Sequence, residues 1–532
     1  MALPAAEAPK LCSHAMLPHV EPEQSALTLP DDVLASILSL LPQKQRRDCF
    51  AVHGGEPEYQ FMSARAALVC RRWAAASRST GSLWESVELS LALPDPHILD
   101  RTEGFVAWLI PRARAVNKLT LTATRDEEAV AAMGLAGGTP LGPLLVWSNL
   151  VSALTLLGPT LNHLAMEWPD ELQLGAWVAT LVALESASFT APRVIVRPGL
   201  GSLPSLTDLR FRSAAKPLTF HAAGAGSPGR HAGGAPLLPA HLVKLKLEGC
   251  RLSELPASLS RLSCLEDLVL SDNNLQSARL SLLSRLTTLQ SLTLMGCHMH
   301  CLPPALSALR NLRVLYLDMA IQAPTPDMAP VHRQCDALLG PLEHLGILSM
   351  GACHLQAFPA ELASHTALRA LYLDDNIMTS LPAGCYLDDL RVLGVDWRVL
   401  FNSHAVLRHA PQLAKLCLTS QSKLELAACT DVDVPAVVAS ITSHPALKQV
   451  LIPSQDGTRG QIVNAALNVL IGISRTPHLE VKAITYPAIG NEWLDWLREV
   501  EAEEGRDGLQ VAAPPALMAR RGAAGTLVRR TG

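Results

Sequence analysis

Five consecutive residues, Cys297 to Cys301, have the sequence Cys-His-Met-His-Cys and contain side chains that often bind zinc. A structural zinc site takes its four ligands from two separated segments, which close a tetrahedron around the ion. No second pair of this kind stands at a suitable distance in the sequence. We therefore predict no metal site, and we expect single histidines such as His344, His354 and His365 at the surface or between structural units.

Residues 224–229, with the sequence Gly-Ala-Gly-Ser-Pro-Gly, match the glycine pattern of dinucleotide-binding loops. Such a loop holds a pyrophosphate only when a helix follows it, because the ligand rests on the helix N-terminus. Pro228, Gly233 and Gly234 oppose a helix, so the pattern indicates a low-complexity loop. The sequence also lacks a P-loop, the zinc-protease and serine-hydrolase motifs and the protein-kinase motifs. We predict a chain that is not an enzyme, with no catalytic residues and no cofactor.

A leucine phrase returns at nearly constant intervals from Leu242 onward. Its first occurrence has leucines at positions one, four and six, then Cys250 in a small polar position, then Leu252, Leu255 and Pro256. The phrase resembles the leucine-rich repeat, in which each unit adds a strand and a helix or irregular arc to a horseshoe. The intervals are 23, 24, 23, 33, 23, 22 and 23 residues, and the later units start at Leu265, Leu289, Leu312, Leu345, Leu368, Leu390 and Leu413.

This resemblance implies an α/β fold, a solenoid with a parallel sheet on its concave face. Leucines at positions one, four and six cannot all lie on one face of a strand, so we expect them to fill the core between stacked units. The polar position needs a small side chain that can bond to the backbone at a tight turn. We expect its cysteines to be structural thiols, neither zinc ligands nor disulfide partners; the position holds Cys250, Asn273, Cys297, Cys353 and Asn376.

The residues between the leucines should face the concave surface, where repeat proteins bind their partners. The central positions of the eight strands are Lys246, Val269, Thr293, Tyr316, Ser349, Tyr372, Gly394 and Cys417. Aromatic residues among carboxylates suit an interface, and the alternative is a solvated strand face whose aromatics only stack on one another. The hypothesis is a target-binding strip for a partner of basic character, made of Lys246, Tyr316, Tyr372, Asp374, Asp396 and Trp397.

Two short segments near the N-terminus have helical patterns. Pro30 suits a first helical position and Asp31 and Asp32 suit the first turn. Apolar residues then recur on one broad face until Pro42 ends the helix. In the second segment, Ala67-Leu-Val-Cys-Arg-Arg-Trp73, Val69 and Trp73 share a helix face. Helices this short need a partner to bury that face.

Taken together, the two segments resemble an F-box, the helical module that binds the Skp adaptor of cullin–RING ubiquitin ligases. The resemblance implies a substrate-recognition subunit of a Skp–cullin–F-box ligase, with the repeats holding a target protein. One departure is an insertion at about residues 43–62, which leaves adaptor binding open. The residues that would contact the adaptor are Leu29, Pro30, Val33, Leu34, Ile37, Leu38, Leu41, Pro42, Leu68, Val69, Cys70 and Trp73.

Two alternatives remain open, a repeat scaffold that engages no ligase and a receptor for a small molecule. Weaker repeats continue the phasing upstream, at Val116, Leu161 and Leu206, and Trp493, Trp496, Leu497 and Val500 predict a helix that closes the solenoid. The expected organisation is a disordered segment at 1–26, the F-box-like module at 27–82, degenerate repeats at 83–241 with a Gly/Ala-rich loop at 213–236, regular repeats at 242–420 with an insertion at 322–340, longer C-terminal repeats with a capping helix at 421–504, and a disordered tail at 505–532.

The composition of the chain indicates which partners and which cellular compartment to expect. The formal net charge of −4 over 532 residues gives no reason to expect a nucleic-acid partner. Residues 129–166 lack charged side chains, but glycines and prolines divide them into pieces too short to span a membrane. Twelve scattered cysteines and the absence of a secretory signal pattern favour a reducing compartment. We expect a cytoplasmic or nuclear location, or both.

Overall fold

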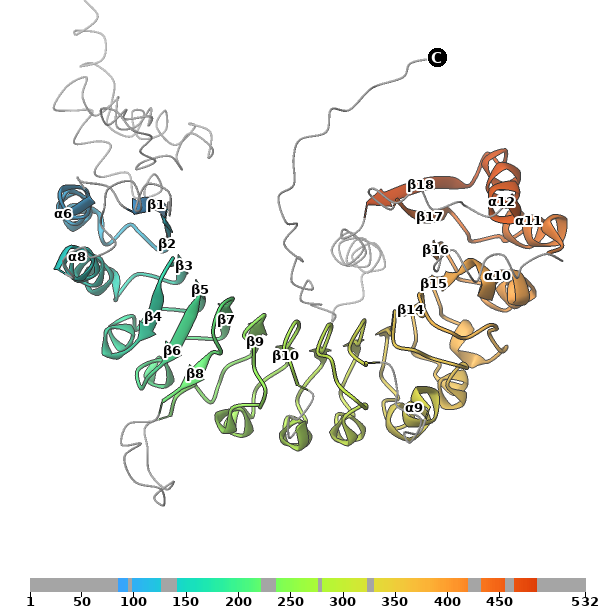
Figure 1. Ribbon diagram of the computed structural model, residues 1–532, viewed down its shortest axis with the longest axis horizontal. Helices are drawn as coiled ribbons and strands as arrows, with labels where there is room; N and C mark the ends of the chain where they lie inside the picture. Colours follow the sequence, from blue (N-terminus) through green and yellow to red (C-terminus); the bar gives the residue numbers. More distant parts are fainter. Residues whose placement is uncertain are drawn as a thin grey trace, which may run out of the picture.

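The computed structural model describes residues 85–93, 98–125, 141–221, 236–275, 280–322, 330–419, 432–454 and 464–485. The F-box-like segment with all its candidate adaptor contacts lies outside these ranges, as do the expected C-terminal capping helix and the tail. The described part forms a horseshoe in which a continuous sheet lines the inner side (Figure 1).

The main sheet has fifteen strands, and each runs parallel to its neighbours. The order follows the chain, because each repeat returns to lay its strand beside the previous one. The strands are β1 (Ser86–Leu93), β2 (Lys118–Arg125), β3 (His163–Glu167), β5 (Ser186–Ala191), β7 (Asp208–Ser213), β9 (Lys244–Glu248), β10 (Asp267–Val269), β11 (Ser291–Thr293), β12 (Val314–Tyr316), β13 (Ile347–Ser349), β14 (Ala370–Tyr372), β15 (Val392–Asp396), β16 (Lys415–Thr419), β17 (Gln449–Ser454) and β18 (Glu480–Thr485).

Helices cover the outer side of the sheet (Figure 1). The longer connections contain α-helices, and so does the short connection between β15 and β16, whereas the other short repeats make a single 3₁₀ turn. The α-helices are α6 (Ile98–Leu109), α8 (Leu141–Leu157), α9 (Val331–Leu339), α10 (Trp397–Ser403), α11 (Val434–Thr442) and α12 (Asn464–Ser474). The 3₁₀ turns are η2 (Ile110–Arg112), η4 (Ala176–Thr180), η5 (Leu200–Ser202), η6 (Ala257–Arg261), η7 (Leu280–Arg285), η8 (Pro304–Ala308), η9 (Ala360–Ser364), η10 (Cys385–Leu387) and η11 (His404–His409).

The repeat leucines form the core, as the sequence predicts. Leu368, Leu371 and Leu373 occupy positions one, four and six of one unit, and all three are fully buried. Leu371, at position four, lies on strand β14. Its partners in register on the two adjacent strands, β13 and β15, are also leucines, Leu348 and Leu393. Each unit therefore stacks its leucines on those of the units before and after it, which makes one continuous core.

Three features of the fold were not foreseen from the sequence. The expected loop at 213–236 includes strand β8 (Thr219–Phe220), which joins β4 (Glu171–Leu174) and β6 (Arg193–Val196) in a second parallel sheet. The expected insertion at 322–340 includes helix α9. A further repeat unit with strand β5 also stands between two of the units that the phasing identified, because Ala187 and Phe189 replace its leucines.

The apolar stretch around residues 129–166 contains helix α8 and strand β3, in line with the expectation of buried repeat elements. Within the described ranges, no helix has both the length and the apolar character that crossing a bilayer requires.

Burial along the strands changes character midway through the sheet. In β2, β3, β5 and β7 the side chains alternate between buried ones on the core side and accessible ones on the concave side. In β10 to β16 every strand residue is buried. A sheet with one solvated face shows the alternating pattern, so the concave face is solvated in the first part of the horseshoe and buried in the second.

Candidate interaction surface

The central concave positions predicted from the repeat phrase form one row across the sheet. The pairing register joins Lys246 to Val269, Val269 to Thr293, and so on through Tyr316, Ser349, Tyr372 and Gly394 to Cys417. The repeat pattern in the sequence therefore predicted this row correctly. Tyr316 and Tyr372 occupy equivalent positions in register on β12 and β14, with Ser349 of β13 between them.

Both tyrosines are buried rather than presented to solvent. Tyr316 is 8% exposed and Tyr372 is 7% exposed, although they project from the concave side and not into the leucine core. They belong to a second apolar cluster, which we call the concave cluster: Val314, Tyr316, Ile347, Ala370, Tyr372, Val392, Cys417 and Leu451, with Met295 packed against it.

Trp397 does not belong to the concave row. It is the first residue of helix α10, is 2% exposed and packs in the main core, with its ring centroid 5.6 Å from that of Phe401. The expectation that it lies on a strand of the target-binding strip was therefore wrong. The chain turns from strand to helix at Asp396, and this turn directs the indole into the core.

Asp396 is the last residue of strand β15, and its carboxylate accepts several hydrogen bonds. Its Oδ1 accepts hydrogen bonds from Thr419 Oγ1 at 2.7 Å and from the backbone N–H of Asp375 at 3.0 Å. Its Oδ2 accepts one from the backbone N–H of Asn376 at 3.3 Å. Burial raises the pKa of Asp396 to about 6, and these bonds oppose the rise. The carboxylate thus ties its own unit to the unit before it and to the unit after it.

Asp374 of the expected strip, and Asp318 near it, carry less charge than their sequence suggests. Burial, and then Asp318, Asp375 and Asp396 nearby, raise the pKa of Asp374 to about 8. Asp318 accepts hydrogen bonds from Ser349 Oγ and from the backbone N–H of Gly351, and burial raises its pKa as well. At neutral pH Asp374 is mainly protonated, which weakens the hypothesis of a target of basic character.

Asp374 gives a prediction about pH and stability. Its pKa rises from an ordinary value of 3.8 to about 8 on folding, so its favourable contribution is complete below pH 4 and is lost as the pH rises through 8. Replacing Asp374 with Asn should therefore raise the unfolding free energy more at pH 8 than at pH 5. We expect a difference of about 2 kcal/mol, less than the full shift implies because the side chain is not wholly removed from water. Urea titrations at both values measure it, and a variant equally stabilised at both would contradict it.

Lys246, the candidate residue at the N-terminal end of the row, lies on strand β9 and is 7% exposed. Burial lowers its pKa, as does the neighbouring Arg210, whereas Asp267 on the adjacent strand raises it. Lys246 stands where the polar part of the concave face meets the buried part.

The polar position of the repeat phrase works as predicted. Cys250 donates to Phe211 O at 3.3 Å, Cys297 to Leu270 O at 3.1 Å and Cys353 to Leu317 O at 2.9 Å. All three are buried free thiols. Each bonds to the backbone of the preceding unit, so the thiols tie successive turns together. Among the described residues, no group of three or more His, Cys, Asp or Glu side chains could hold a metal ion.

Burial of these thiols predicts their reactivity. It raises the pKa values of Cys250 and Cys297 to about 12, so the reactive thiolate is scarce at pH 8. In the native protein we expect iodoacetamide to modify the exposed Cys264, Cys301 and Cys385 first. Cys250 and Cys297 should react only after unfolding, and peptide mass spectrometry distinguishes the two groups. Rapid modification of Cys250 in the folded chain would contradict the structural role.

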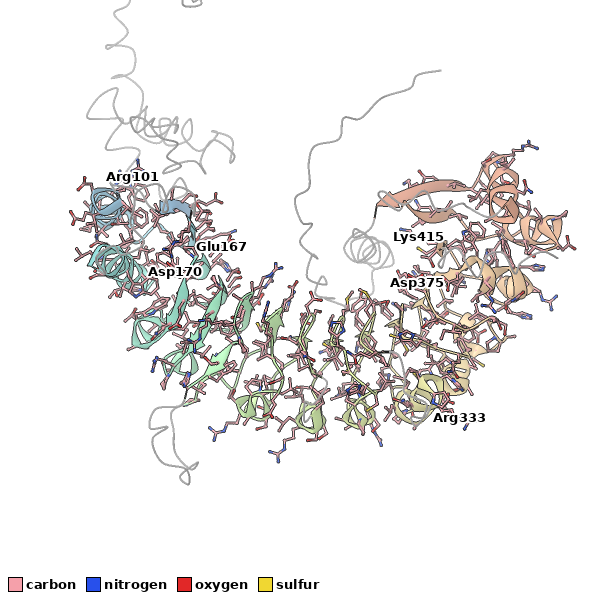
Figure 2. The ribbon with its side chains drawn as sticks, in the orientation of Figure 1. Arg101, Glu167, Asp170, Arg333, Asp375 and Lys415 are labelled. Atoms are coloured by element: carbon pink, nitrogen blue, oxygen red, sulfur yellow. The ribbon has the colours of Figure 1, made fainter. Side chains whose placement is uncertain are left out.

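The structure reveals two surface features that sequence reasoning missed. The first is the polar concave face over β2 to β7, which carries the accessible side chains Lys118, His163, Glu167 and Arg210. Figure 2 labels Glu167 on the inner side of this arm and Lys415 on the inner side of the opposite arm. The concave position of each strand could have identified these residues once the degenerate repeats were phased.

The second feature is a basic edge formed by residues that immediately precede the strands. Arg313, Arg369 and Arg391 stand one residue before β12, β14 and β15. The first two line a pocket of about 560 Å³ together with Gln290 and His344. In each of these repeats the arginine directly follows the first leucine of the repeat pattern. The sequence alone could therefore have predicted that the three arginines lie along one edge of the sheet.

Comparison with known proteins agrees with the arrangement of modules. Residues 26–90 match the F-box-like family model, a range that ends within strand β1. The chain combines an F-box-like domain with a leucine-rich-repeat solenoid. The F-box/leucine-rich-repeat resemblance noted in the sequence is thus confirmed, since the repeats are seen directly in the sheet.

Solved structures similar to this F-box/leucine-rich-repeat chain are remote. A leucine-rich-repeat protein of Leptospira interrogans has 17% identity and a TM-score of 0.43, with 76% of this chain and 91% of that chain covered. A TLR13 complex with ssRNA13 has 15% identity and a TM-score of 0.44, with 75% and 51% covered. The Drosophila Toll–Spatzle complex has 18% identity and a TM-score of 0.43, with 69% and 51% covered. No curated protein matches the chain.

Proposed function

We propose that the chain is the substrate-recognition subunit of a Skp–cullin–F-box ubiquitin ligase. The observation that carries the proposal is the F-box-like match at residues 26–90, joined without a break to the first strand of a repeat solenoid. F-box domains generally bind Skp-type adaptors, and solenoids offer an extended concave surface for a protein partner.

In this role the chain performs no chemistry itself. It holds a target near the ubiquitin-charged enzyme, and the gain in rate comes from proximity. Other subunits carry the reactive groups, in keeping with the absence of catalytic motifs in the sequence. The partners are a Skp-type adaptor, a cullin–RING ligase bound through it, and a target protein.

The target surface that fits best is the polar concave face over β2 to β7. It is accessible, and its mixed charges include Lys118, Glu167 and Arg210. It also lies at the end of the horseshoe that follows the F-box-like segment in the chain (Figure 1). A target bound there would therefore be held close to the adaptor. The buried tyrosines of the original target-binding hypothesis offer no comparable access.

Co-purification tests the proposal. The tagged full-length chain should capture a Skp-type adaptor and a cullin, and the chain lacking residues 27–82 should capture neither. Circular dichroism checks that the repeats of the shortened chain remain folded. If the full-length chain is folded and captures no adaptor, the alternative of a scaffold without ligase engagement is favoured, since the insertion at 43–62 would then have disabled the module.

A further inference from the structure

The concave cluster is an apolar surface on the side of the sheet where water would normally lie. Its members come from strands β12 to β17, and Tyr372, Val392 and Cys417 are all below a tenth exposed. Among the elements that the structure describes, none lies on the concave side of these strands, because the helices stand on the outer side (Figure 1). Sheets bury a second face only against another layer.

We propose that the chain's own C-terminal segment, residues 486–504, forms this layer by packing on the concave cluster. The segment contains Trp493, Trp496, Leu497 and Val500. This spacing puts all four side chains on one face of a helix. The sequence pattern that suggested a cap for the end of the solenoid thus supplies an apolar face of the kind that the cluster needs.

The length of the segment suits the cluster. A helix of about fifteen residues is roughly 22 Å long, and six parallel strands span about 24 Å from first to last. The segment begins directly after β18, whose neighbour β17 contributes Leu451 to the cluster. The chain therefore enters at one end of the cluster and can run along it.

Charge favours the same placement. The charged positions of the segment are mainly acidic, with Glu492, Asp495 and Glu499 among the apolar residues and three further glutamates at 501, 503 and 504, whereas Arg498 is its one basic residue. The concave cluster lies beside the basic edge, which Arg313, Arg369 and Arg391 form, and Lys415 stands at the concave side of β16. A helix with an apolar face and acidic flanks complements the basic margin before the strands, whereas Asp318 and Asp374, whose pKa values burial raises, stand at the opposite margin after them.

The consequence is a division of the concave face. The segment occupies the part over β12 to β17, and the polar part over β2 to β7 remains open for another protein. This placement does not depend on ligase engagement, so it can be tested without the adaptor.

Cys417 provides the probe, because it is a member of the concave cluster and is 4% exposed. The full-length double variant Trp493→Asp/Trp496→Asp should expose it, and we expect its alkylation rate by iodoacetamide to rise at least tenfold over that in the unmodified chain. Peptide mass spectrometry reads each cysteine separately. The matched control is Leu517→Asp/Met518→Asp, which puts the same charges in the tail beyond the segment and should leave Cys417 protected.

Cys250 and Cys353, which lie in the main core, report global unfolding in the same experiment. The proposal is supported if Cys417 reacts while these two stay protected. It is overturned if Cys417 stays protected in the double variant, or if Cys417 is already reactive in the unmodified chain, as expected of a strip left open for a partner. If all three cysteines react, the double variant has unfolded, and the single variant Trp496→Ala is tested in its place. Reaction of Cys417 alone then supports the proposal, and continued protection of Cys417 overturns it.

Discussion

Replacing Leu38 with Asp is expected to abolish co-precipitation of the chain with a Skp-type adaptor. Leu38 lies on the broad apolar face of the first F-box-like helical pattern, with Leu34 and Ile37. Truncating a buried anchor costs about 2 kcal/mol or more at an interface, and a buried carboxylate costs further desolvation. We expect at least a hundredfold weaker binding, measured by titration of the purified adaptor.

The control for this variant is Val182→Asp, which places the same charge on a side chain that is 48% exposed on the solenoid. It should bind the adaptor as the unmodified chain does. Trp73→Ala should weaken binding in the same direction as Leu38→Asp, because the second segment completes the F-box resemblance. Undiminished binding by both F-box variants, with folded repeats, would refute the assignment of the adaptor contact.

Replacing Asn376 with Ala is expected to destabilise the solenoid by about 3 kcal/mol, because several buried backbone groups lose their partners. Its Nδ2 donates to Met350 O at 2.8 Å and to Leu373 O at 2.9 Å. Its Oδ1 accepts from the N–H groups of Cys353 at 3.1 Å and Leu355 at 2.9 Å. One side chain thus satisfies backbone groups in two consecutive units.

Urea denaturation followed by circular dichroism measures the effect of Asn376→Ala. The control is Asn274→Ala, a substitution of the same type at an exposed position, for which we expect a change within about 0.5 kcal/mol. Equal unfolding free energies for the two variants would show that the bonds at Asn376 do not stabilise the repeat.

Much of the fold follows from the repeat phrase because its physical demands are local and recur. The leucines must be buried, the polar position must bond to backbone, and both requirements fix the register of the strands. The aligned row from Lys246 to Cys417 was therefore predictable residue by residue. The leucine pattern did not predict the unit of β5, because Ala187 and Phe189 fill the core positions that leucines occupy in the other units.

The candidate site was less predictable, for two physical reasons. Whether Trp397 continues a strand or begins a helix depends on how the chain turns at Asp396, which the leucine pattern does not specify. Whether Tyr316 and Tyr372 are accessible depends on what packs on the concave side, which is a tertiary property. The adaptor contacts rest on the F-box-like match and lie outside the described residues, so they stay predictions.

The change of burial between β7 and β10 also bears on how the horseshoe can bend. A sheet packed on both faces resists a change of curvature, since bending compresses one layer against the other and interiors are close-packed. The strands β10 to β16 should therefore move as a stiff unit, whereas β1 to β7, packed on the outer side alone, can open or tighten around a bound protein. Any change of curvature would then fall in the part from β1 to β7, which follows the F-box-like segment in the chain, while the part from β10 to β16 keeps its shape.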